Sequence, residues 1–114
     1  MTTQEKDLTF FSVTQEHKDT LVMLSETLFT TTAGAFKASV ALALSKGLAP
    51  ETFSNGLTQS TATTISDLVE FLEWYCETDT PVRLANGLGH AGVAYVKREL
   101  ERGMDAKDIY FPSL

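Results

Sequence analysis

The segment at residues 87–92, GLGHAG, has the glycine spacing of a loop that binds the phosphates of a dinucleotide. Such a loop follows a strand in a βαβ unit, with an acidic residue about 20 residues further on. Here the segment follows Thr80 and Pro81, and a proline at this place is typical of a helix start. We interpret the glycines as a helix break that lets two helices approach closely. The alternative is an anion on the free amides where the last helix begins.

The residues that could bind a metal or act as a nucleophile are His17, His90 and the single cysteine, Cys76. They lie far apart in the sequence, and none has a further ligand at the spacing of a zinc site. A pair of Cys76 and His90 would have to be made by the fold. Cys76 falls on the apolar face of an expected helix, which favours a buried thiol. We therefore predict no catalytic residue, metal or cofactor, and a protein that is not an enzyme.

Three carboxylates, Glu70, Glu73 and Glu77, fall on one side of the same expected helix. Acid–base chemistry would require one of them to be desolvated, but the apolar residues lie on the opposite face, so we expect all three to be exposed. Trp74 lies next to these acids. Either it is an interface anchor, as exposed tryptophans often are, or it is a partly covered core residue.

The charge of the chain is unevenly distributed around a net value of −6. Five acids and no base fall between Ile65 and Asp79, whereas five bases outnumber four acids from Thr80 onward. The net charge argues against a nucleic-acid footprint over the whole molecule. Acidic and basic helices can pair within one molecule or between copies, or they are two solvated faces. The candidate basic contacts with nucleic acid or a partner are Lys97, Arg98 and Arg102.

A chain of 114 residues with 43% apolar content predicts a single domain, residues 1–114. No apolar run approaches the roughly 20 residues that cross a bilayer, and the polar residues 1–7 do not resemble a secretory signal. One cysteine fits a reducing compartment. We expect a cytoplasmic protein without a membrane partner or an evident small-molecule substrate.

The N-terminal part, residues 8–48, has the pattern of a strand followed by two helices. Residues 8–13 are rich in aromatic and β-branched side chains, which predicts a strand. Helices are expected from a cap at Thr14 through Leu28, and over residues 33–46 with a cap at Thr32 or Thr31 and an end at Gly47. Residues 51–63 are polar and predict a loop.

No other segment has a strand pattern, so we expect the strand to pair with the same segment of a second chain. In this register Phe11 faces inward. The predicted oligomer interface comprises Leu8, Thr9, Phe10, Phe11, Ser12 and Val13.

The C-terminal half, residues 64–114, is expected to be helical. A helix over residues 65–77 should bury an apolar face of Ile65, Leu68, Val69, Leu72, Tyr75 and Cys76. The next helix should begin at Pro81, break near Asn86, resume at Gly89 and end at Gly103. The apolar tail, residues 109–114, should pack back on a helix. The predicted fold is mainly α, with four to five short helices and one short N-terminal β-strand.

The order of elements over residues 8–48 resembles a ribbon-helix-helix unit. The resemblance rests on apolar positions at Val13, Leu21, Leu24, Phe36 and Val40. In that family two chains contribute one strand each, and the strand pair enters the major groove of DNA. The residues expected to face the groove are Leu8, Phe10 and Ser12, and none of them offers the Arg, Lys, Asn or Gln side chains that read bases. The resemblance therefore implies dimerisation through the strand more than base recognition.

The whole chain is also similar to the small helical DndE family of bacterial DNA phosphorothioation systems. The order agrees: an N-terminal segment, two helices of which the second is alanine-rich, a polar loop, and a closing helix with residues 90–96, HAGVAYV. This similarity implies an oligomeric, non-catalytic, DNA-associated protein that uses surface lysines. The present chain departs from it in being acidic and poor in lysine.

These patterns favour a non-enzymatic, homo-oligomeric accessory or regulatory protein, associated with DNA in a bacterial or mobile-element defence-type system. The alternative is a protein-binding adaptor or inhibitor that uses the acidic helix around Trp74. Retardation of DNA that disappears with added salt would favour the first, since phosphate contacts release counterions.

Overall fold

The computed structural model describes residues 10–50, 58–61 and 66–111. Helices take up more than half of these residues, which confirms the prediction of a mainly helical fold. The elements in chain order are β1 (Phe10–Val13), α1 (Gln15–Thr27), α2 (Thr32–Lys46), β2 (Thr58–Thr61), α3 (Ser66–Tyr75), α4 (Pro81–Glu101) and α5 (Ala106–Tyr110).

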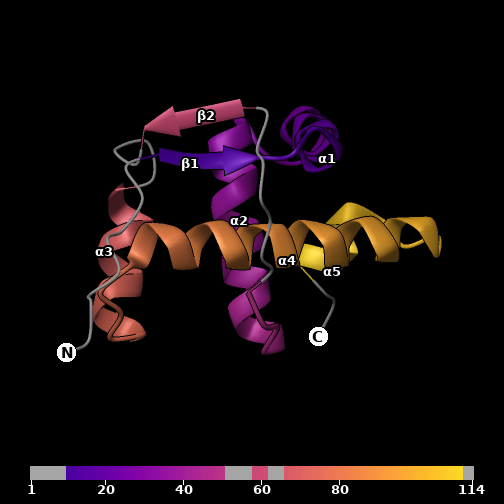
Figure 1. Ribbon diagram of the computed structural model, residues 1–114. Helices are drawn as coiled ribbons and strands as arrows, with labels where there is room; N and C mark the ends of the chain where they lie inside the picture. Colours follow the sequence, from indigo (N-terminus) through magenta and orange to yellow (C-terminus); the bar gives the residue numbers. More distant parts are fainter. Residues whose placement is uncertain (1–9, 51–57, 62–65, 112–114) are drawn as a thin grey trace.

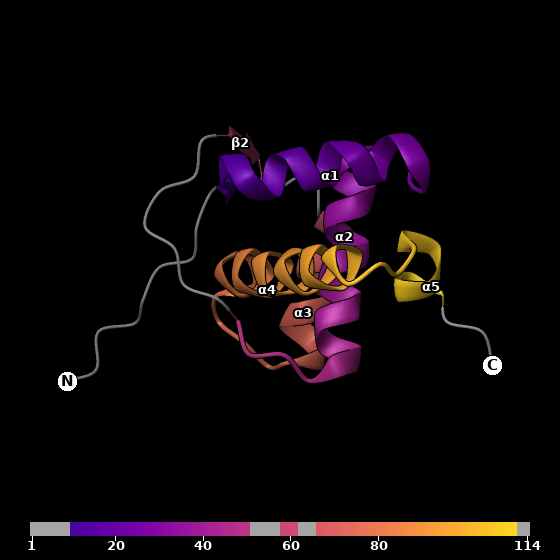
Figure 2. The same ribbon diagram turned by 90° about the vertical axis from the view of Figure 1, so that its right-hand side faces the viewer.

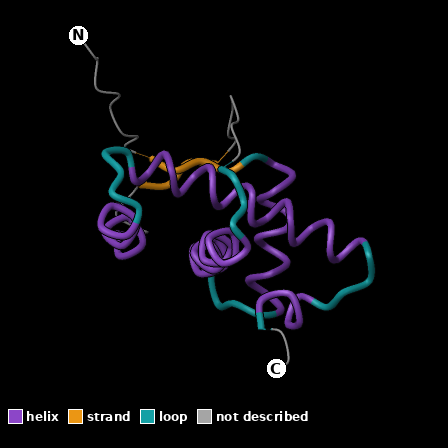
Figure 3. Tube along the Cα trace, turned by 90° about the horizontal axis from the view of Figure 1, so that it is seen from below, coloured by secondary structure: helices purple, strands orange, loops and turns teal. Residues whose placement is uncertain are grey.

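The long helix α4 crosses α2 at the centre of the molecule (Figure 1). α3 lies beside the first turns of α4, and Figure 3 shows that its axis runs roughly along the direction of α2. The two-stranded ribbon and α1 cover α4 from one side, and α5 lies near its C-terminal end (Figure 2). The core is formed where α1, α2, α3 and α4 face one another.

Local sequence explains the starts of the first two helices and the end of the second. The side chain of Thr14 accepts a hydrogen bond from the backbone N–H of His17, and Thr31 does the same for Gly34 at 2.9 Å. α2 ends at Gly47, whose φ of 66° is a left-handed conformation that glycine adopts without strain. These predicted caps are confirmed, with Thr31 rather than Thr32 as the cap of α2.

The strand β1 pairs antiparallel with β2, with Phe10 opposite Thr61 and Val13 opposite Thr58. Residues 58–61 belong to the stretch predicted to be a loop, so the premise that nothing else in the chain could pair with the strand is wrong. β2 was not predicted because its sequence, TQST, has β-branched residues but no alternation of apolar and polar residues. Pairing of β1 with a second chain stays a prediction, and it would have to use the edge of β1 that β2 does not occupy.

Most of the predicted oligomer interface lies outside what the structure describes. Leu8 and Thr9 precede the described residues, and the side chains of Phe10, Phe11 and Ser12 are not described. The inward direction expected for Phe11 is therefore not tested. Val13 is buried and belongs to the core of its own chain.

α4 is continuous from Pro81 to Glu101, so the predicted break near Asn86 is wrong. The predicted close approach of two helices is confirmed. A Cβ atom on Gly89 would lie 2.3 Å from the Phe36 ring, and one on Gly92 would lie 2.1 Å from the carbonyl oxygen of Ser39. These glycines let α4 pack directly on α2, and this packing outweighs their low helix propensity. Because residues 87–92 lie inside a helix, they form neither a dinucleotide loop nor a free helix start for an anion.

The C-terminal segment packs back on the helices, as predicted for residues 109–110. Ile109 is buried, and the Tyr110 hydroxyl lies 2.8 Å from the Ser39 hydroxyl on α2. The Tyr110 ring also meets Phe29 edge-on at 5.0 Å between centroids. Residues 112–114 lie outside the described part of the chain.

Among the described helices, none is long and apolar enough by itself to cross a membrane. α1 and α2 reach the required length and composition only as a pair bent by 105°.

Candidate functional site

The outer side of α3 carries three exposed aromatic side chains, which we call the α3 aromatic surface: Phe71, Trp74 and Tyr75. Trp74 is 77% exposed, Tyr75 is 62% exposed and Phe71 is 44% exposed. The Phe71 and Tyr75 rings, one helical turn apart, stack at 5.2 Å between centroids and 14° between planes. Trp74 lies about 60° from Phe71 around the helix, so the three side chains share one side of α3.

The opposite side of α3 fixes this surface in place. Leu72 is completely buried, and Leu68, Val69 and Cys76 pack against the core. An α-helix turns by about 100° per residue, which places Trp74 about 160° away from Leu72. The outward direction of Trp74 is thus imposed by the burial of Leu72.

An ion pair ties the start of α3 to α2. The Lys37 ammonium lies 3.2 Å from both carboxylate oxygens of Asp67, and one of these oxygens also accepts a hydrogen bond from the Leu68 N–H. The hydrogen bond from Lys37 is the main reason that the pKa of Asp67 is lowered, and the Leu68 N–H adds to it. Lys37 is consequently engaged in holding the helix.

Tyr75 was predicted to be on the buried face of α3, and this was wrong. It lies about 60° from Leu72 around the helix but only about 40° from Phe71, at the margin of the apolar stripe. α3 ends at Tyr75, and Glu77 adopts a φ of 50° as the chain turns away. The end of the helix leaves the Tyr75 ring uncovered, which periodicity alone did not indicate.

The three carboxylates Glu70, Glu73 and Glu77 are exposed, as expected. They lack the burial that acid–base catalysis uses to tune a carboxyl group. Glu70 precedes Trp74 by one helical turn and therefore lies beside the indole, and Glu73 lies one turn after Glu70 on the same side of the helix. The sequence of α3, SDLVEFLEWY, contains no base. The α3 aromatic surface thus has an acidic rim.

The basic residues proposed as contacts lie elsewhere. Lys97 is paired with Glu16 of α1, and Arg102 donates a hydrogen bond to Glu99 at 3.1 Å. Arg98 is exposed. All three belong to the C-terminal end of α4 or the residue after it, whereas α3 lies beside its N-terminal end (Figure 1). The structure therefore does not bring the acidic and basic candidate residues together within one chain.

The structure brings together two residues that the sequence kept apart. The rings of His17 on α1 and His90 on α4 lie 5.1 Å apart between centroids. His90 is buried, and its Nδ1 atom is 2.7 Å from the carbonyl oxygen of Asn86. Burial is the main cause that lowers the pKa of His90, and the charge of His17 adds to it. The inward position of His17 was not predicted from the sequence. Its spacing from Leu21 and Leu24, which puts all three on one face of α1, is the signal that could have indicated this position.

Within the described ranges, no group of three or more His, Cys, Asp or Glu side chains could hold a metal ion. Cys76 directly follows α3 and is half-buried against the core, in agreement with the expected buried thiol.

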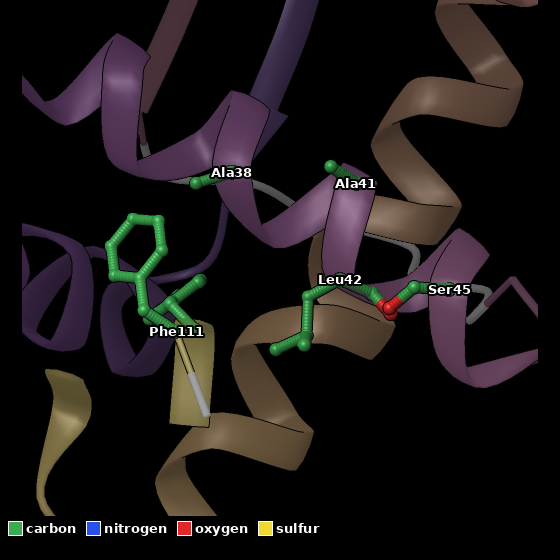
Figure 4. Close-up of a pocket in the computed structure, with 6 residues that line it drawn as sticks. Ala38, Ala41, Leu42, Ser45 and Phe111 are labelled. Atoms are coloured by element: carbon green, nitrogen blue, oxygen red, sulfur yellow. The ribbon is translucent and has the colours of Figure 1, made fainter. Parts of the chain in front are cut away.

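A shallow depression lies between α2 and α5, with a volume of about 270 Å³ (Figure 4). Its walls are mostly small or apolar: Ala38, Ala41, Leu42, Ser45, Tyr110 and Phe111. The alanines of α2 leave this space because their side chains end at Cβ. A second depression of about 190 Å³ lies between α1 and α4, where Glu16 and Glu101 accompany Lys97 and Arg98. Neither depression is enclosed and also lined by charged side chains of a single sign, as a site for a charged small molecule would be.

In comparisons with known proteins, no family model, no curated protein and no solved structure matches this chain.

Proposed function

We propose that this chain is a non-enzymatic protein-binding adaptor or inhibitor, and that it contacts its partner through the α3 aromatic surface. The observation that carries the proposal is the 77% exposure of Trp74 on a helix whose other face is firmly buried. Tryptophan and tyrosine are the residues most enriched among those that dominate binding energy at interfaces. Trp74 contributes little to the core of its own chain. Exposing its large apolar side chain to water is unfavourable, and a partner that covers the side chain best explains why it is there.

The size of the surface supports this function. A large aromatic side chain has about 150–250 Å² of accessible area, so the three rings together expose about 400 Å². The largest exposed apolar patch on a typical monomer is about 300–600 Å² and is often functional. Covering this area would contribute up to about 10 kcal/mol at ~25 cal/mol per Å², before the cost of association is subtracted.

The function is tested by capture of the partner from an extract of the source cells. The immobilised chain and a Phe111→Ala variant should retain the same protein, whereas Trp74→Ala should lose it. Phe111 is a suitable control because it is also aromatic and exposed, at 59%, but lies after α5. Loss of an anchor tryptophan costs about 2 kcal/mol or more, roughly 30-fold in affinity.

The stability of the same variants separates contact from folding. An exposed side chain outside the core should change the free energy of unfolding by at most about 0.5 kcal/mol. Trp74→Ala should therefore melt like the wild type. A variant that still captures the protein, or that loses binding only because it unfolds, contradicts the proposal.

A second candidate is a homo-oligomeric DNA-associated accessory protein of a defence-type system. The observation that favours it is the order strand, helix, helix from β1 to α2, which is the order that the ribbon-helix-helix resemblance implies. The net charge of −6 and the acidic partners of Lys97 and Arg102 weigh against it. Retardation of duplex DNA at low salt, together with a dimeric mass by sedimentation, would favour this candidate over the first.

A further inference from the structure

We infer that the partner of the α3 aromatic surface is a positively charged polypeptide segment, whose arginine or lysine side chains cover Trp74 and pair with Glu70 and Glu73. This inference rests on the proposed function and specifies the chemistry of the partner.

The charge around the rings points to a cationic partner. Glu70 lies one turn before Trp74 and about 40° from it around the helix, so its carboxylate reaches a group placed over the indole. Glu73 points about 100° away from Trp74 but lies one turn after Glu70 on the same side, where it reaches the next cationic group of an extended partner. Both are exposed, and neither pairs with a base of α3, which has none. Lys37, which lies nearby on α2, is engaged by Asp67. An acidic partner would place like charges against this rim.

The aromatic faces suit the same partner. The face of a tryptophan or tyrosine ring attracts a cation within about 6 Å of its centroid, and the attraction is strongest for tryptophan. This chain already contains one such contact, with the Lys46 ammonium 5.9 Å from the centre of the Tyr95 ring. An arginine fits the rim best, because its planar guanidinium stacks on the indole while its N–H groups donate to a carboxylate.

A second copy of this chain fits less well. Its own bases at the far end of α4 are partly neutralised, since Lys97 pairs with Glu16 and Arg102 with Glu99. Each copy carries a net charge of −6, so copies repel one another over the longer range. A contact between the two ends of α4 would also join unlike surfaces, so each added copy would leave one of the two surfaces open until a ring or filament had formed. The partner is therefore a different, basic chain.

The experiment uses two fluorescently labelled synthetic peptides. In the first, pairs of leucine residues alternate with pairs of arginine residues, and in the second every arginine is replaced by glutamine. Binding to the full-length chain is measured by fluorescence anisotropy at low and at moderate salt. Trp74 is the only tryptophan, so its emission reports directly on whether the α3 aromatic surface becomes covered. We expect the arginine peptide to bind at least tenfold more tightly, to shift the Trp74 emission to the blue, and to weaken as salt is added.

Matched variants separate the rim from the overall charge. Glu70→Gln with Glu73→Gln should weaken binding of the arginine peptide about tenfold, and Trp74→Ala about 30-fold. Glu26→Gln with Asp108→Asn removes the same charge from exposed positions on α1 and α5 and should change binding less than twofold.

Three outcomes overturn the inference. They are equal binding of both peptides, equal weakening in the two double variants, and binding of the arginine peptide that Trp74→Ala leaves intact. The first of these would leave the proposed function standing, because capture of the partner from the extract does not depend on its charge. Failure of that capture, in contrast, would remove the function itself.

Discussion

Replacing Gly92 with alanine tests the packing of α4 on α2 most directly. Helix propensity alone predicts that Gly92→Ala stabilises the interior of α4 by about 1 kcal/mol. The structure predicts the opposite, because the new Cβ atom would lie 2.1 Å from the carbonyl oxygen and 2.7 Å from the carbonyl carbon of Ser39. Both atoms belong to the backbone of α2, which cannot rotate out of the way.

The magnitude follows from how far the helices must separate. To restore a separation of 3.0 Å between Cβ and the oxygen, the two helices have to move apart locally by 0.9 Å. A gap of about 0.5–1 Å forfeits a quarter to a half of the dispersion energy of the side chains beside it. Overpacking of this kind typically costs about 1–3 kcal/mol. The fully buried Val40 and Val93 lie on these two helices and are expected to lose contacts. After the gain in propensity of about 1 kcal/mol is subtracted, we expect a net loss of up to about 2 kcal/mol.

Urea unfolding followed by circular dichroism measures this loss as a lower midpoint at an unchanged slope. Gly89→Ala provides the comparison, because its Cβ would meet the ring of Phe36 rather than a backbone. Phe36→Leu removes the clashing ring atoms, so it should relieve part of the cost of Gly89→Ala but none of the cost of Gly92→Ala. If Gly92→Ala is more stable than the wild type, the close approach of the helices is incorrect.

Two further predictions concern buried polar groups. The pKa of His90 is held below its ordinary value near 6.5, mainly by burial, so the unfolded chain takes up more protons as the pH falls. The contribution of His90 to the free energy of unfolding should be constant above pH about 6.5 and should decrease as the pH falls through the lowered pKa of the folded state. Urea unfolding at about pH 7.5 and 5.5 measures this decrease, and His90→Gln should make it smaller. If the decrease is the same in His90→Gln, other groups cause it. Tyr110→Phe removes the hydroxyl that lies 2.8 Å from the Ser39 hydroxyl and should cost about 1 kcal/mol by the same measurement, whereas a cost equally large in a Ser39→Ala background would show that this hydrogen bond is not its source.

The first two helices were predictable because their signals are local. Thr14, Thr31 and Gly47 each act within a few residues of the helix end that they define, so the sequence contains the cause and its effect together. The spacing of Leu21 and Leu24 likewise indicates the buried face of α1 without knowledge of what covers it.

The continuity of α4 could not be predicted in this way. Gly89 and Gly92 reduce helix propensity locally, and only the presence of α2 against them reverses the outcome. The same dependence on distant residues explains why β2 was missed, since the polar strand Thr58–Thr61 is recognisable only through its pairing with β1. The contact between His17 and His90 is a third case, because α1 and α4 are brought together by the fold alone.

The candidate site likewise contains features that local sequence predicts and features that depend on the rest of the fold. The place of Trp74 and Glu70 on the polar side of α3 followed from their angle to Leu72 on one helix, which is local information. The sequence left open whether Trp74 is partly covered, and its 77% exposure decides against a core residue. The exposure of Tyr75 depended on where α3 ends. The separation of the acidic helix from Lys97 depended on how α4 spans the molecule (Figure 1), which no short pattern records.

The anchoring of α3 determines how precisely its aromatic surface is presented. A helix of ten residues is marginal by itself in water, so α3 depends on what holds it. The ion pair between Lys37 and Asp67 is exposed and screened by water, so it contributes little, whereas complete burial of a leucine such as Leu72 contributes about 1.5–3 kcal/mol. The apolar face is therefore the main support, and the outer face is free to carry residues that serve a partner. Because the rings of Phe71 and Tyr75 already stack, a partner that binds there has less side-chain freedom to restrict, and more of the burial energy remains for affinity.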